Sequence, residues 1–206
     1  GWVDSPFTLF GSLIVPMMVV GLGIADSFAG ERERRTLETL LASRLSDRTI
    51  LFGKMGAHIS EAMQFLILFH LASMTALNLG HWQGEILLYT PGIALANLVL
   101  GFLVASLAAG LGVLLSLRAS SVQQATQSLM VATMSPFILA SFGSVLIGNV
   151  LPDSWREAFE AFFRNTIATA DFARAFLAIA AILALADLAL VVASMARFQR
   201  ARLMER

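Results

Sequence analysis

The stretch "GIALANLVLGFLVASLAAGLGVLLSL", residues 92–117, contains no ionisable side chain. A helix needs about 18 or more apolar residues to cross a hydrocarbon core about 30 Å thick. The stretch is long enough, so it predicts a membrane-spanning helix. Further runs of this kind lie on both sides of it, which indicates a chain that crosses the membrane several times.

The composition of the 206-residue chain also favours a membrane protein. Hydrophobic residues make up 57% of the chain and charged residues only 14%, whereas an ordinary soluble domain carries about 25% charged residues. The net charge is zero and no basic cluster is interleaved with aromatic residues, which argues against nucleic acid as a partner. Cysteine is absent, which excludes disulfides and cysteine-ligated metals.

The expected fold is an all-α bundle of five transmembrane helices within a single domain, residues 1–206. Proline inside two of the spans, Pro16 and Pro136, is compatible with membrane helices because neighbouring helices can satisfy the freed carbonyl groups. The loop at 80–91 has the glycine, proline and aromatic residues of an interfacial turn. The predicted spans are approximately 7–25, 57–79, 92–117, 128–151 and 173–196.

The segment "PDSWREAFEAFFRNTIATADFAR", residues 152–174, differs from the spans. Its large apolar side chains, beginning with Trp155 and Phe159, recur at helical spacing between polar residues. This pattern predicts an amphipathic helix that lies on the membrane surface.

The distribution of Lys and Arg predicts the orientation, because cytoplasmic loops carry an excess of these residues. If 26–54 is cytoplasmic, alternation of the spans places the N-terminus outside, the 152–174 helix outside and the C-terminus inside. The outer side then holds only Arg156, Arg164 and Arg174. The inner side holds eleven cations, Arg32, Arg34, Arg35, Arg44, Arg48, Lys54, Arg118, Arg197, Arg200, Arg202 and Arg206.

The charged stretch between the first two spans, "ERERRTLETLLASRLSDRTILFGK" at 31–54, has a helical pattern of leucines and charges. Glu31 with Arg35 and Arg34 with Glu38 form two i to i+4 pairs of favourable orientation. Ser46 or Asp47 supplies an N-cap for a second helix that leads into the membrane. The pattern fits an amphipathic helix on the bilayer and equally a docking element for a partner protein, and periodicity does not separate the two.

The longer stretch at 27–54 resembles the membrane subunits of type-2 ATP-binding-cassette exporters. The resemblance rests on an acidic and basic run, Thr-Leu-Glu, a Leu-Leu pair, a turn and a helix with Gly-Lys, here Glu31, Glu33, Thr36, Leu37, Glu38, Leu40, Leu41, Ser46, Gly53 and Lys54. Such subunits typically have six spans, so the resemblance implies that one N-terminal span is missing. One departure is Arg35, where the family usually has glycine, and a stiffer start to the helix is expected.

The resemblance implies a permease subunit that forms the translocation path, pairs with a second permease chain and docks a separate ATPase through 26–54. It further implies a bacterial cytoplasmic membrane. The residues implied to couple to the ATPase are Glu31, Glu33, Arg34, Thr36, Leu37, Glu38, Leu40 and Leu41.

Nucleotide and metal chemistry are not expected in this chain. It has no glycine-rich phosphate loop followed by Lys and Ser or Thr, so ATP should bind only to the partner and the chain should not be an enzyme. Three scattered histidines, His58, His70 and His81, do not match a zinc-binding spacing. No cofactor is therefore predicted.

Asp187 falls near the middle of the last span. A carboxylate there costs roughly 2.5 to 3.5 kcal/mol on insertion scales, which makes it a functional candidate. A pairing with His70, at similar depth in the second span, is predicted, although a packing role satisfied by another polar group fits as well. Alternatives to the exporter are a membrane scaffold that recruits a soluble partner through 31–54 without transport, and an ion-coupled transporter that uses Asp187. The sequence does not indicate the substrate.

Overall fold

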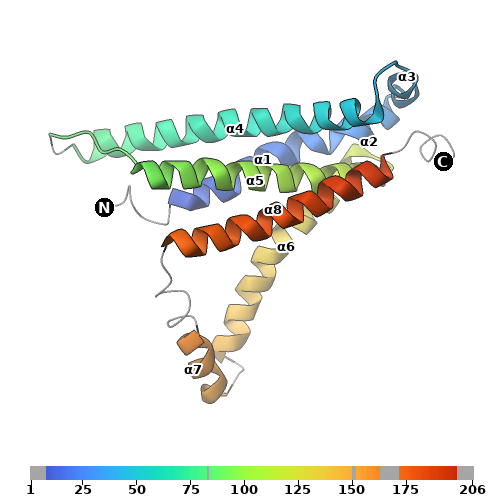
Figure 1. The fold of residues 1–206 in the computed structure, drawn as a ribbon. Coiled ribbons are helices and arrows are strands. Elements are labelled where there is room, and N and C mark those ends of the chain that lie inside the picture. The colour runs from blue at the N-terminus through green and yellow to red at the C-terminus, as the bar shows by residue number, and fades with distance from the viewer. Residues whose placement is uncertain (1–7, 83, 150–151, 163–171, 199–206) are drawn as a thin grey trace.

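The computed structural model describes residues 8–82, 84–149, 152–162 and 172–198, and the regular elements in these ranges are all helices (Figure 1). This confirms the predicted all-α fold. The helices are α1 (Leu9–Ile24), α2 (Asp26–Glu33), α3 (Leu37–Leu41), α4 (Asp47–Gly80), α5 (Pro91–Ser116), α6 (Val122–Asn149), α7 (Asp153–Phe162) and α8 (Phe172–Arg197).

Helix α5 is the centre of the bundle and packs against α1, α4 and α8 (Figure 1). Its small residues allow this close approach: a Cβ atom at Gly101 would clash with the side chain of Leu66, and one at Gly112 would clash with Ile24. A Cβ at Gly110 would lie 3.0 Å from Cβ of Leu190 on α8. The apolar stretch at 92–117 therefore forms a helix that packs against three others, because small residues at helix interfaces allow close contact.

Four helical segments are long and apolar enough to cross a membrane: Gly11–Glu33, Asp47–Gly80, Pro91–Ser116 and Ala173–Arg197. Each overlaps one of the predicted spans, but Gly11–Glu33 extends beyond 7–25 and Asp47–Gly80 begins well before 57–79. The outer faces of α4, α5 and α8 carry exposed large apolar side chains such as Leu68, Phe102 and Leu185, as expected for helices that face lipid. Helix α6 covers the fifth predicted span, 128–151, through Asn149, but is not among these four segments.

Helix α6 leaves the bundle. It contacts α1, α2 and α5 and then runs away from the other long helices, with α7 beyond its far end (Figure 1). Ala125 and Leu129 near its start are buried, whereas Val131, Leu139 and Phe142 further along are exposed. The far part of α6 is therefore an apolar surface without cover from the described helices.

The charged stretch at 31–54 contains the end of α2, all of α3 and the start of α4, whereas its two predicted i to i+4 pairs need one unbroken helix. Helix α2 ends at Glu33 and α3 begins at Leu37, with a break between them. The predicted N-cap is confirmed at Ser46, whose hydroxyl accepts a hydrogen bond from Thr49 N at 3.2 Å. The helix that follows this cap is continuous with the predicted second span, so α4 runs without interruption for 34 residues.

Most of the cations assigned to the cytoplasm lie together. The α2 and α3 segments, the starts of α4 and α6 and the ends of α5 and α8 meet at one end of the molecule (Figure 1). We call this end the basic end, defined by Arg32, Arg34, Arg35, Arg44, Arg48, Lys54, Arg118 and Arg197. The other predicted inner cations, Arg200, Arg202 and Arg206, lie outside the described residues, as do Arg164 and the end of the predicted surface helix.

Candidate coupling site

Helix α2 is held at its first turn by a side chain of α5. Ser116 is fully buried, and its hydroxyl accepts hydrogen bonds from Phe28 N at 3.2 Å and Ala29 N at 2.9 Å. The same hydroxyl donates to Ala25 O at 2.8 Å. The first backbone N–H groups of a helix have no partner within the helix. Ser116 therefore caps α2, although it lies about 90 residues further along the chain.

Two side chains at the end of α2 bind the turn between α5 and α6. The Arg32 guanidinium donates to the backbone carbonyls of Ala119 and of Leu117, the latter at 3.0 Å. A carboxylate oxygen of Glu33 accepts from Val122 N at 2.9 Å, at the first residue of α6. Arg32 places a positive charge at the carbonyl groups that follow α5, and Glu33 places a negative charge at the first amide of α6. Both positions are favoured by the helix dipoles. Helix α2 therefore joins the end of α5 to the start of α6.

Glu31 links α2 to α4 and to α3. Its Oε1 lies 2.9 Å from Lys54 Nζ of α4, and its Oε2 accepts a hydrogen bond of 2.8 Å from the Thr36 hydroxyl. Lys54 also donates to Ser27 O, and its Nζ lies 5.1 Å from the centre of the Phe28 ring. Both charged side chains are partly buried, so this ion pair is less screened than a surface pair.

Arg34 pairs within its own segment. Its guanidinium lies 2.9 Å from Asp26 Oδ2, and both side chains are about half exposed. The hydrogen bond and charge of Asp26 raise the pKa of Arg34 above its ordinary value. Exposed pairs of this kind contribute little to stability.

The predicted i to i+4 pairs, Glu31 with Arg35 and Arg34 with Glu38, are wrong because the helix breaks between them. Arg35 has φ of 56°, in the left-handed region that favours glycine. The resembling family usually has glycine at this position, so Arg35 adopts the backbone conformation that glycine would supply. The expected stiffening of the helix start is therefore replaced by a turn.

Leu37 and Leu40 of α3 do not form the exposed row that a groove on a partner would need. Leu37 is buried in the hydrophobic core of the chain, and Leu40 packs against that core. The side chain of Leu41 is outside the described part of the structure. Among the α3 side chains that the structure describes, Glu38 and Thr39 are the exposed ones. A docking partner would therefore meet Glu38 and Thr39 on α3 before it met Leu37.

The two intramembrane candidates are not brought together. Both carboxylate oxygens of Asp187 are buried without a hydrogen-bond partner among the described residues, and so is Nε2 of His70. Nδ1 of His70 lies 2.9 Å from Leu66 O, and its ring packs edge-on against Tyr89. Asp187 and Ser194, seven residues apart on α8, are both buried.

Comparison with protein-family models matches residues 5–164 to the family described as ABC-2 family transporter protein. The chain belongs to this family. It is thus an ABC transporter permease and a multi-pass membrane protein, and membership implies an ABC ATPase as its partner. No curated protein and no solved structure gives a significant match to the chain. Helix α8 lies beyond the matched residues.

Sequence reasoning selected the 26–54 segment as the candidate coupling site but missed two of its main contacts. Arg32 and Ser116 were not among the predicted site residues, although they join α2 to α5. Arg32 belongs to a run of charges in which nothing distinguishes it, and Ser116 is one hydroxyl in an apolar span. A serine in the last turn of a span and an arginine after a span are weak signals of a tertiary contact. No cluster of three or more potential metal ligands occurs in the residues that the structure describes.

Proposed function

We propose that this chain is the permease subunit of an ATP-driven ABC exporter that forms the translocation path and receives ATPase movement through 26–54. The observation that supports this most is the junction made by α2, whose side chains contact α4, α5 and α6 at the basic end. An element that only lay on the bilayer would not need hydrogen bonds to three other helices. Helix α3, directly attached to α2, presents Glu38 and Thr39 outward for the ATPase.

Single-cysteine cross-linking tests the docking, because the chain has no native cysteine. Glu38→Cys lies on the outer face of α3, and Ser120→Cys lies in the exposed turn after α5 at the same end. With the partner ATPase co-expressed, a short bifunctional reagent should join it to the Glu38→Cys variant at least about tenfold more than to Ser120→Cys. Equal yields at the two positions would contradict docking through α3.

Transport must then be measured in vesicles that contain the permease and the ATPase. Export predicts that a transported compound stimulates ATP hydrolysis and that Glu38→Ala lowers ATPase recovery if its carboxylate pairs with a cation of the partner. The scaffold alternative predicts ATPase recovery without any ATP-dependent transport. The ion-coupled alternative predicts transport driven by an ion gradient without ATP and abolished by Asp187→Asn.

A second permease chain and a bacterial cytoplasmic membrane remain parts of the proposal. The exposed apolar side chains along α6, including Val131 and Phe142, offer a surface that lipid or a second chain would cover. Molecular mass measured in detergent by light scattering distinguishes the two: a dimer supports pairing, and a monomer that transports in vesicles contradicts it.

A further inference from the structure

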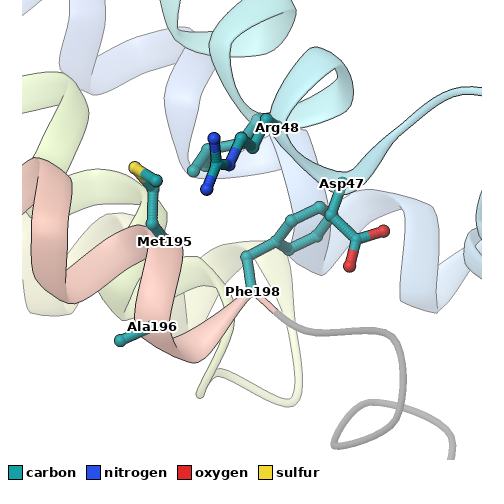
Figure 2. Close-up of a pocket in the computed structure, with 6 residues that line it drawn as sticks. Asp47, Arg48, Met195, Ala196 and Phe198 are labelled. Carbon is teal, nitrogen blue, oxygen red and sulfur yellow. The ribbon is translucent and has the colours of Figure 1, made fainter.

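A crevice of about 320 Å³ lies at the basic end between the start of α4 and the end of α8 (Figure 2). Its lining residues make none of the hydrogen bonds or ion pairs of the α2 junction, although Phe198 packs against Phe28 of α2. Its lining consists of Asp47, Arg48, Leu51, Met195, Ala196 and Phe198. Both helices reach the limit of a candidate membrane span here, since those spans begin at Asp47 and end at Arg197. The crevice therefore lies where two long apolar helices end, on the side of the basic end.

Arg48 provides the positive charge of the crevice. Its side chain is exposed and makes no ion pair with any residue that the structure describes, unlike Arg34 and Lys54. Figure 2 shows the guanidinium extending from α4 toward Met195 of α8. The Asp47 carboxylate, the acidic group of the lining, points away from the guanidinium in this view. The guanidinium is thus free to bind an anion that enters between the two helices.

The rest of the lining is apolar. Leu51 is buried and Phe198 is 2% exposed, with the Phe198 ring packed against Phe28 of α2 at a centroid distance of 5.0 Å. One turn deeper along each helix, Met55 and Val191 belong to the same hydrophobic cluster as this floor. A charged group at the rim and an apolar floor directed toward the spans suit an amphiphile better than a hydrated ion.

We propose that this crevice binds the head group of an anionic phospholipid. The phosphodiester accepts hydrogen bonds from Arg48, whose planar guanidinium can bind two phosphate oxygens at once. The glycerol and the first methylene groups pack on Leu51, Met195 and Phe198. The volume is near the lower limit for small-molecule sites, which are about 300–1,000 Å³. It therefore holds a head group, while the acyl chains extend into the bilayer beside α4 and α8.

The end of the chain is the competing occupant. Residues 199–206 follow Phe198 directly, but they carry Arg200, Arg202 and Arg206 against one acid, Glu205. Their net positive charge disfavours a position beside Arg48. An anionic lipid has the complementary charge, and the cytoplasmic leaflet is rich in such lipids.

Native mass spectrometry of the full chain in detergent tests the proposal with phosphatidylglycerol and phosphatidylcholine as probes. The wild type should retain phosphatidylglycerol over phosphatidylcholine. Arg48→Gln should weaken phosphatidylglycerol binding about tenfold, the factor for one lost charge-assisted hydrogen bond. The matched control is Arg44→Gln, which removes an exposed cation from the same end outside the lining and should change binding less than about twofold. Met195→Trp should fill the crevice and displace the lipid, while Met195→Leu should not.

Three results would overturn the proposal. Equal losses in Arg48→Gln and Arg44→Gln would show that the lipid is attracted only by the general charge of this end. Displacement of the lipid by millimolar glycerol 3-phosphate would assign the crevice to a soluble phosphoester. An increase in lipid binding after deletion of 199–206 would assign it to the end of the chain. Unchanged binding after this deletion, with far-ultraviolet circular dichroism matching the wild type for every variant, supports the lipid site.

Discussion

Replacement of Ser116 by alanine should loosen α2 from the bundle. The hydroxyl makes three hydrogen bonds, to Phe28 N, Ala29 N and Ala25 O, and the side chain is fully buried. A typical net contribution is about 1 kcal/mol per hydrogen bond, and a buried donor left without a partner costs about 1–3 kcal/mol. Since Ser116→Ala leaves two backbone donors near the start of α2, we expect a loss of about 2–4 kcal/mol.

Two measurements follow from this magnitude. In a chain of 206 residues, a loss of about 1 kcal/mol lowers the melting temperature by roughly 2–4 °C, so Ser116→Ala should lower it by roughly 5–15 °C. Hydrogen exchange should accelerate at least about 30-fold at the amides of Phe28 and Ala29, because 1.4 kcal/mol is a factor of ten.

The control for Ser116→Ala is Ser106→Ala, which removes one hydroxyl from the same helix but away from the α2 junction. It should leave exchange in α2 unchanged. Ser116→Thr keeps the hydroxyl and should retain most of the protection. If Ser116→Ala and Ser106→Ala have the same effect on both the melting temperature and exchange, the capping role assigned to Ser116 is refuted.

Three further predictions concern the backbone, the core and the topology. Arg35→Gly should stabilise the protein by up to about 1 kcal/mol by relieving the left-handed conformation, whereas Arg35→Ala should not; equal melting temperatures for the two variants would argue against strain at this position. Gly112→Leu should destabilise the protein by several kcal/mol because its side chain meets Ile24, and a normal yield of folded protein from detergent would contradict this packing. Single cysteines at Ser120 and Ser154 should label from opposite sides of the membrane with an impermeant thiol reagent, and labelling from one side would disprove the orientation.

The helices were predictable because apolar length and charge distribution are local properties of the sequence. The predicted spans at 92–117 and 173–196 match α5 and α8 to within a residue at each end. The break between α2 and α3 was not predictable from periodicity, because Glu31, Arg34 and Glu38 have good helical spacing. Glu31 forms its ion pair with Lys54 of α4 and not with Arg35. Tertiary contacts of this kind override helix propensity, which is a weak local preference.

The role of the leucines shows a related limit. Helical spacing indicated that Leu37 and Leu40 face the same way, which the structure bears out, but it did not indicate what they face. The buried side of α3 turned out to be the chain's own core. Periodicity identifies a buried face without identifying what buries it, and a partner protein and the chain's own spans are equivalent in this respect.

The geometry at α2 favours α6 as the helix that would respond to the ATPase in the proposed function. Force on α3 passes through the backbone to α2, and α2 holds the end of α5 through Arg32 and the start of α6 through Glu33. Helix α5 is packed on three sides and resists displacement, whereas α6 leaves the bundle beyond this contact (Figure 1). Helix α6 has 28 residues and is thus about 42 Å long. If a helix of this length rotates as a rigid body by about 5° about its start, its far end moves by about 4 Å. A small movement of α2 would therefore be amplified along α6, while α5 would serve as the fixed support.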